Sequence, residues 1–137
     1  MKIKDQKEME AWTLSFFSQL KEGSVVGLDG DLGAGKTQMV RWIARFLGWT
    51  GPVTSPTFDF IHTYPTDRGP LRHLDLYRLT SESEVEAIDY EEAFYPEAGW
   101  TFIEWPERAL SYLPRDLIWV KIEKGPGEER EVCLCES

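Results

Sequence analysis

The chain has 137 residues, 42% of them hydrophobic and 13% aromatic. This is enough apolar material for one domain, predicted over residues 1–137, and it excludes wholesale disorder. The formal net charge of −9 excludes broad nonspecific binding to nucleic acid, DNA included, because phosphates repel an acidic surface. No apolar run approaches the roughly 18 residues of a membrane span, and residues 1–10 lack the apolar stretch of a secretory signal, so a cytoplasmic protein without membrane contact is expected.

The first half of the chain predicts a helix, a strand, a glycine-rich bend and a second helix. Residues 6–20 place apolar side chains at the spacing of one helical face, and Gly23 ends that helix. Residues 24–30 form a short apolar run that is typical of a buried strand. Helical spacing returns over residues 36–49, where Gly48 is suited to end the helix.

The second half predicts an antiparallel hairpin followed by alternating helical and extended segments. The hairpin pairs residues 57–64 with residues 71–79 around a loop at 65–70. The later elements are expected at residues 81–94 (a helix with Ser81 as its N-cap), 99–105 (a strand), 106–113 (helical turns), and 116–123 and 130–136 (two strands). This order predicts a three-layer α/β fold with a mixed sheet, parallel around the glycine-rich bend and antiparallel in the hairpins.

One segment is strongly acidic. From Leu79 to Glu107 the chain has no Lys or Arg, and it carries nine acidic residues: Glu82, Glu84, Glu86, Asp89, Glu91, Glu92, Glu97, Glu104 and Glu107. The segment is interpreted either as a solvated face or as a docking surface for a basic patch on a partner protein.

The two cysteines, Cys133 and Cys135, lie two residues apart on the last predicted strand. This spacing puts both thiols on one face without good geometry for a disulfide, and no second Cys or His pair accompanies them. They are interpreted as ordinary strand residues, with a zinc or redox role as the alternative.

The glycine-rich bend carries the strongest functional signal. Its sequence, GDLGAGKT, matches the nucleotide-binding pattern G-x-x-x-x-G-K-[ST] and comprises Gly30, Asp31, Leu32, Gly33, Ala34, Gly35, Lys36 and Thr37. Glycines allow successive N–H groups to converge on a phosphate, and the helix N-terminus adds partial positive charge. Lys36 would neutralise the β- and γ-phosphates, and the Thr37 hydroxyl could coordinate Mg²⁺. The alternative is a glycine-rich turn with an exposed lysine.

A site that hydrolyses a nucleotide also needs a carboxylate near Mg²⁺ and a group that places the attacking water. Asp75 and Glu104 lie at or near the ends of strand-like segments, where α/β proteins build their sites, although either could be an ordinary surface acid. Thr57 could contact the γ-phosphate through its hydroxyl. Trp105, beside Glu104, is more typical of a core residue.

Taken together and in this order, the segments GDLGAGKT, TSPTF, HLDLYRL and IEWPERA resemble the TsaE (YjeE) family of bacterial P-loop ATPases. The resemblance covers roughly residues 6–123, and it is specific because four separated motifs agree. It implies an Mg²⁺-dependent ATPase that acts with the proteins TsaD and TsaB in forming N6-threonylcarbamoyladenosine at position 37 of tRNAs that read codons beginning with A. Hydrolysis is expected to be slow without these partners, and tRNA is met only through the complex.

The resemblance also implies roles for individual residues: phosphate and nucleotide contacts for residues 30–37 and Gln38, with Lys36 on the phosphates; Mg²⁺ binding for Thr37 and Glu104; a catalytic acid at Asp75; a switch-like loop at Thr57; and a place beside the nucleotide for Trp105. Arg72 and His73 stand where an apolar run usually precedes the metal-binding acid. Which of Asp75 and Glu104 meets the metal therefore stays open.

Two other classes of function stay open. A small-molecule kinase would use the same loop and metal to move phosphate onto a metabolite, although the chain has little room for a lid or an acceptor pocket. A nucleotide-dependent switch would bind ATP and order the Thr57 loop for a partner, with negligible catalysis. The sequence has no N-K-x-D element for reading guanine, which favours ATP over GTP.

Overall fold

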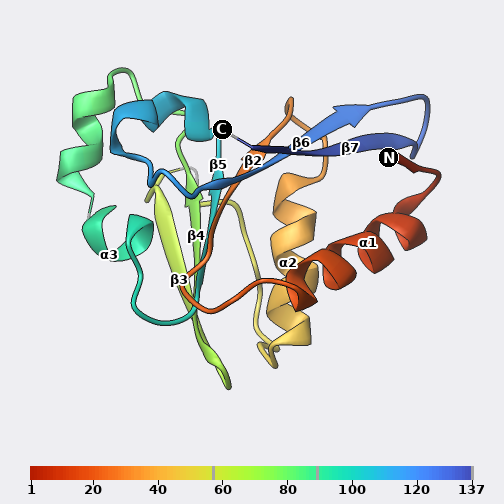
Figure 1. Cartoon of the computed structure of the whole chain (residues 1–137), viewed down its shortest axis with the longest axis horizontal. Coiled ribbons are helices and arrows are strands. Elements are labelled where there is room, and N and C mark those ends of the chain that lie inside the picture. The colour runs from red at the N-terminus through yellow and green to blue at the C-terminus, as the bar shows by residue number, and fades with distance from the viewer. Residues whose placement is uncertain (57, 89, 137) are drawn as a thin grey trace.

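The computed structural model describes residues 1–56, 58–88 and 90–136, and its strands form one seven-stranded sheet in the order β1-β7-β6-β2-β5-β4-β3 (Figure 1). Along the chain the elements are β1 (Lys2–Ile3), α1 (Gln6–Ser18), β2 (Val25–Asp29), α2 (Lys36–Phe46), β3 (Ile61–Thr66), β4 (Gly69–Asp75), the 3₁₀ helix η1 (Glu82–Ala87), α3 (Tyr90–Phe94), β5 (Trp100–Glu104), the 3₁₀ helix η2 (Pro106–Tyr112), β6 (Ile118–Lys124) and β7 (Arg130–Glu136). Within these described residues, no helix is both long enough and apolar enough to cross a membrane.

The centre of the sheet is parallel, as the sequence predicts for the strands around the glycine-rich bend. β2 lies between β5 and β6 and runs parallel to both, and β4 runs parallel to β5. The register pairs Leu28 of β2 with Glu104 of β5, and Glu104 with Asp75 of β4. The carboxyl ends of β2, β5 and β4 therefore meet at one edge of the sheet, where α/β proteins commonly bind ligands.

The outer strands are antiparallel, which confirms the predicted hairpins and the mixed sheet. β3 pairs with β4, and β7 pairs with both β6 and β1. The first hairpin is tighter than the sequence predicts, because the register continues through Pro65↔Pro70 to Thr66↔Gly69. Gly69 has a φ of 122°, a left-handed value open to glycine, and this lets the chain turn sharply after Arg68.

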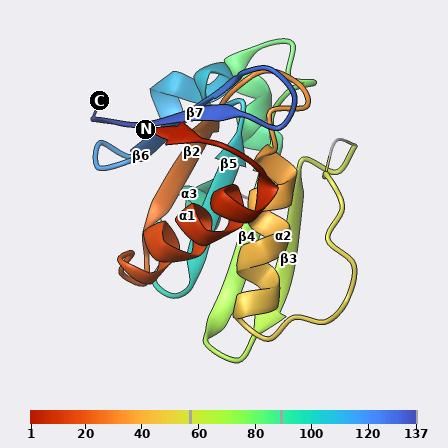
Figure 2. The same ribbon diagram turned by 90° about the vertical axis from the view of Figure 1, so that its right-hand side faces the viewer.

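Alternate residues of the central strands face two hydrophobic clusters, one on each side of the sheet. Val26 and Phe102 belong to the cluster under α1 and α2, whereas Val25 and Ile103 belong to the cluster under η1, α3 and η2. Figure 2 shows α1 and α2 together on their face of the sheet. The sheet is thus the middle of three layers.

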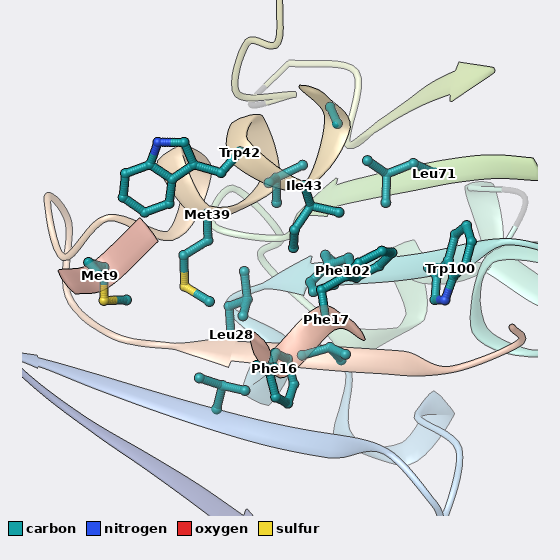
Figure 3. Packing of buried hydrophobic residues seen from close by; sticks show 14 of the residues in the cluster. Met9, Phe16, Phe17, Leu28, Met39, Trp42, Ile43, Leu71, Trp100 and Phe102 are labelled. Atoms are coloured by element: carbon teal, nitrogen blue, oxygen red, sulfur yellow. The ribbon is translucent and has the colours of Figure 1, made fainter. Parts of the chain in front are cut away.

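The helix predicted at residues 6–20 is α1. It begins after Asp5, whose side chain accepts a hydrogen bond from the Glu8 N–H at 2.9 Å. Phe17 is buried, and its ring centre lies 5.0 Å from that of Trp100 on β5 (Figure 3). Burial of one such side chain contributes about 1.5–3 kcal/mol to stability. Its packing against Trp100 holds α1 against the sheet.

The helical character predicted over residues 81–94 is confirmed, but the segment is not one continuous helix. The segment forms η1 and the short α3, and Ile88 between them is extended (φ −101°, ψ 152°). Val85 and Phe94 are both fully buried in the cluster under these elements. A continuous helix would point residues nine apart to opposite sides. Packing against the sheet therefore breaks the helix.

Ser81 is the N-cap residue of η1, as predicted, but the side-chain bonds expected of the cap differ. The Ser81 hydroxyl makes no capping bond. The Glu84 carboxylate instead accepts from the N–H of Thr80 at 3.2 Å and from the Thr80 hydroxyl, one residue before the predicted position.

Both cysteines lie on β7, as predicted. Cys133 and Cys135 are exposed and not bridged, and their Sγ atoms are 3.5 Å apart.

Candidate functional site

The glycine-rich bend joins the end of β2 to the start of α2, so it lies at the carboxyl edge of the parallel strands. Gly33 and Gly35 have φ values of 81° and 109°, which side chains with a Cβ rarely adopt. Gly35 is the N-cap residue of α2 and has no side chain with which to cap the helix. The first N–H groups of α2 can therefore serve a ligand, and the helix dipole favours an anion there.

Neighbouring strands hold the bend in shape. A Cβ on Gly30 would lie 2.7 Å from the carbonyl oxygen of Ile122 on β6, so only glycine allows this close approach. On β7, Arg130 donates from Nε to the carbonyl oxygen of buried Ala34 at 3.0 Å. Arg130 has no role among the sequence predictions, because no local pattern reveals a contact between residues 96 positions apart.

Lys36 is the first residue of α2 and is only 4% exposed. Its Nζ donates to the Gly30 carbonyl oxygen at 2.5 Å and lies 3.9 Å from the centre of a Trp105 ring. Burial lowers the pKa of the Lys36 amine from its ordinary 10.5, although the nearby charges of Glu104 and Asp75 oppose this shift. The alternative of a turn with an exposed lysine is therefore wrong.

Glu104 ends β5 and contacts the start of α2. Its Oε2 accepts from the Thr37 hydroxyl at 2.7 Å and lies 2.6 Å from Nε2 of His73 on β4. Burial opposes ionisation of Glu104, but the His73 and Thr37 hydrogen bonds and the charge of Lys36 outweigh it, so its pKa is lowered from 4.5. Glu104 is therefore a buried carboxylate, and Thr37 keeps hydroxyl lone pairs for another partner.

Asp75 ends β4 and is paired in register with Glu104 on the next strand. It is 5% exposed, and its Oδ2 accepts from the Ser55 hydroxyl at 2.8 Å while its Oδ1 accepts from the Tyr77 N–H at 3.0 Å. The carboxylate thus ties β4 to the segment that contains Ser55. Neither acid is an ordinary surface residue, which was the alternative for both.

Trp105 has a strained backbone. Its φ of 60° and ψ of 50° lie in the left-handed region, which is unusual for a bulky residue and typical of functional sites. The conformation accompanies the turn from β5 into η2 and places the indole beside Lys36, with the Tyr77 ring centre 5.0 Å away. Trp105 is half-buried and is not a fully enclosed core residue.

These groups meet in one cleft of about 450 Å³, a volume typical of small-ligand sites. The described residues that line it are Leu32, Gly33, Gly35, Lys36, Thr37, Gln38, Ser55, Asp75, Tyr77, Glu104 and Trp105. The cleft combines an ammonium group, two carboxylates, hydroxyls and aromatic rings at the start of a helix. Such a set can hold an anionic ligand and a cation bound to it.

Other predicted residues lie outside the described lining of the cleft. Gly30 and Ala34 shape the bend from the side of β6 and β7, and Asp31 is exposed. Thr57 lies outside the described residues, and its contact with a γ-phosphate stays a prediction. The sequence analysis gives no individual role to three residues that belong to the site or contact it: Ser55, His73 and Tyr77. They lie within the motifs TSPTF and HLDLYRL.

Comparison with known proteins identifies relatives of the chain. The family model described as threonylcarbamoyl adenosine biosynthesis protein TsaE matches residues 3–132. The tRNA threonylcarbamoyladenosine biosynthesis protein TsaE of Synechocystis is 41% identical, with 82% of this chain and 72% of that protein covered. The protein of the same name from Rickettsia bellii is 37% identical, with coverage of 93% and 88%.

The fold has a solved counterpart in the crystal structure of Bacillus subtilis YdiB. The two structures align with a TM-score of 0.76 and 28% sequence identity, over 98% of this chain and 82% of that one. The family match spans the glycine-rich bend and both strand-end acids, Asp75 and Glu104. The chain therefore belongs to the TsaE family of threonylcarbamoyl adenosine biosynthesis proteins.

Proposed function

We propose that the chain is an Mg²⁺-dependent P-loop ATPase that acts with TsaD and TsaB in forming N6-threonylcarbamoyladenosine at position 37 of tRNAs that read codons beginning with A. One observation carries the ATPase part of the proposal. Lys36, Thr37 and Glu104 converge on a glycine-rich helix start that has the geometry of a phosphate site. The family to which the chain belongs supports the role in tRNA modification.

The residues present suit a bound Mg²⁺ ion. Thr37 and Glu104 would hold the metal, because a hydroxyl and an ionised carboxylate are the hard oxygen donors that it prefers. The described residues contain no cluster of three or more His, Cys, Asp or Glu side chains placed to bind a metal. This agrees with a site in which nucleotide phosphates and water complete the coordination. When bound, the metal supplies neutralisation of charge on the phosphate oxygens.

The chain's own groups account for the remaining steps of ATP hydrolysis. Lys36 and the N–H groups of the bend would bind the phosphates, and Asp75 would orient the attacking water. Lys36 is the one cation among the described residues that line the cleft. Arg108 lies near Trp105, but its guanidinium donates to the Leu79 carbonyl oxygen at 3.1 Å. Slow hydrolysis is therefore expected until a partner adds charge or order to the site.

The acidic segment supports docking to a protein partner. A second cleft, of about 1070 Å³, opens between α3 and η2 and is lined in part by Glu91, Glu92, Glu97 and three tyrosines. Asp89 of the same segment lies outside the described residues. An acidic and aromatic surface is complementary to a basic protein surface and repels tRNA phosphates. Contact with tRNA would thus be made through the partner proteins.

The test is ATP turnover by the purified chain with and without the TsaB–TsaD pair. We expect phosphate release to be slow for the chain alone and to rise by on the order of 10²-fold with the partners, the effect typical of one added transition-state contact. Lys36→Ala should abolish turnover in both cases. Equal rates with and without the pair would contradict the proposal.

The reaction product and a test in cells separate the proposed function from its alternatives. A phosphorylated metabolite in place of free phosphate would indicate a kinase. A binding switch would require that a variant able to bind ATP but unable to hydrolyse it keeps full tRNA modification in cells. The proposal predicts that such a variant fails there.

A further inference from the structure

His73 is a buried group to which the proposed mechanism gives no task. It lies on β4 two residues before Asp75 and is 0% exposed. Its Nε2 lies 2.6 Å from Oε2 of Glu104, and its Nδ1 has no hydrogen-bond partner among the described residues. A buried polar atom without a partner is unfavourable, because it loses its hydrogen bonds to water. An apolar residue at this place in the sheet would avoid that, so the imidazole calls for an explanation.

The bond to Glu104 requires a proton on Nε2 of His73. An ionised carboxylate can only accept hydrogen bonds, so Nε2 carries the proton and donates it to Oε2. Oε2 also accepts from the Thr37 hydroxyl at 2.7 Å. One carboxylate oxygen is therefore held from two sides, by β4 and by α2.

This double contact fixes the direction of the other oxygen, Oε1. Glu104 ends its strand and lines the cleft, so its side chain needs a hydrogen-bond partner to keep it in one rotamer. His73 provides this partner from the interior of the sheet, where the register places it beside Phe102 of β5. A donor on a central strand is more rigid than one on a loop.

We propose that His73 is a positioning residue that holds Glu104 in the orientation needed for metal and nucleotide binding. The proposal rests on the proposed function, because it assigns His73 to the same site. His73 is not among the described residues that line the cleft, so it acts through Glu104. Outer groups that orient a metal ligand typically change metal affinity by about 10–100-fold when they are replaced.

The test measures how strongly metal and nucleotide binding are coupled. A fluorescent, non-hydrolysable ATP analogue is titrated into each purified variant with Mn²⁺ and again with a chelator. The readout is the ratio of the two affinities, which does not depend on turnover. In the wild-type chain Mn²⁺ should strengthen binding of the analogue.

The variants of His73 differ in where they place a hydrogen-bond donor. The amide of Gln reaches the position of Nε2, whereas the amide of Asn is one methylene shorter. We expect His73→Asn to reduce the ratio by about 10–100-fold, and His73→Gln to retain most of it. Affinity in chelator should stay close to wild type in both. His62 faces His73 across the β3–β4 register and contacts the exposed carboxylate of Asp59, so His62→Asn is the matched control and should change neither affinity.

The outcomes distinguish failure of the proposed function from failure of the role proposed for His73. A wild-type chain that binds the analogue neither with nor without metal contradicts the proposed function itself. A wild-type ratio in folded His73→Asn overturns only the role of His73. If His73→Asn does not fold, ¹⁵N NMR of the wild-type imidazole decides. The Nε2–H resonance should then shift when metal and analogue are added together, and an unchanged resonance overturns the proposal.

Discussion

At the scale of single residues, the site keeps a carboxylate ionised where burial alone would neutralise it. Glu104 is 4% exposed, and two donors on its Oε2 together with the Lys36 ammonium offset the loss of hydration. The arrangement matters for chemistry because only the ionised form can meet a divalent cation. It also links the stability of the fold to pH.

The lowered pKa of Glu104 sets the direction of that link. A carboxyl group whose pKa is lower in the folded chain stabilises it above the ordinary pKa, and this contribution is lost as the pH falls through the folded value. The loss is therefore expected below pH 4.5, the ordinary pKa. Urea unfolding across this range should show a steeper loss of stability for wild type than for Glu104→Gln. Parallel curves would contradict the assignment, and Glu123→Gln, an exposed acid on β6, is the control.

The left-handed backbone of Trp105 favours glycine over other small residues at this position. At a φ of 60° a residue with a Cβ is strained by about 1–2 kcal/mol relative to glycine. Both Trp105→Gly and Trp105→Ala remove the indole, but only glycine relieves the strain. We expect the Gly variant to unfold at a higher urea concentration, with an advantage of about 1 kcal/mol. The same pair at exposed Leu110 in η2 should show the usual order, with Ala more stable. An Ala variant of Trp105 that is more stable than the Gly variant, as at Leu110, would show that the backbone is not strained.

At the scale of elements, the phosphate-binding bend depends on how closely β6 passes it. Gly30→Ala would bring a Cβ within 2.7 Å of the Ile122 carbonyl oxygen, closer than such atoms approach. We expect the free energy of unfolding to fall by about 1–3 kcal/mol, as in an overpacked core, and nucleotide affinity to fall with it. Urea unfolding and a binding titration measure the two effects. Gly125→Ala lies in the exposed turn after β6, where the nearest atom is Glu129 Cβ at 3.1 Å, and should have little effect on either. Wild-type stability in Gly30→Ala would contradict the steric argument.

Elements with a strong local pattern could be predicted from the sequence. The apolar period of α1 and α2, Gly48 after α2 and the bend between β2 and α2 all depend on neighbouring residues. The break at Ile88 could not be predicted, because it depends on how Val85 and Phe94 both reach the sheet. The contacts of His73 and Arg130 depend on sheet register and on residues far apart in the chain. The residue types of the site could thus be predicted from the sequence. The long-range contacts that hold their side chains in place could not.

At the scale of the whole molecule, the candidate nucleotide site and the acidic cleft lie on different parts of the surface. The cleft over the bend contains Lys36 and lies at the carboxyl edge of the sheet, whereas the larger cleft lies by α3 and η2 and is lined by carboxylates. With a net charge of −9, the chain repels polyanions over most of its surface. If a basic protein partner binds through this acidic surface, its association with the chain should therefore be fast at low salt and slow at high salt.

Removing charge from the larger cleft should weaken this electrostatic attraction. Glu91 and Glu97 are exposed and line the larger cleft, whereas Glu92 contacts the buried Arg72 at 3.2 Å and is left unchanged. We expect Glu91→Gln with Glu97→Gln to slow association with the TsaB–TsaD pair by roughly tenfold at low salt and to flatten its salt dependence, because steering by charge acts mainly on the association rate. Stopped-flow mixing at several salt concentrations measures both, and hydrolysis by the chain alone should not change. Glu10→Gln with Glu123→Gln removes the same charge from α1 and β6, and should have a smaller effect. Equal effects from the two pairs would show that net charge, and not this acidic surface, guides the encounter.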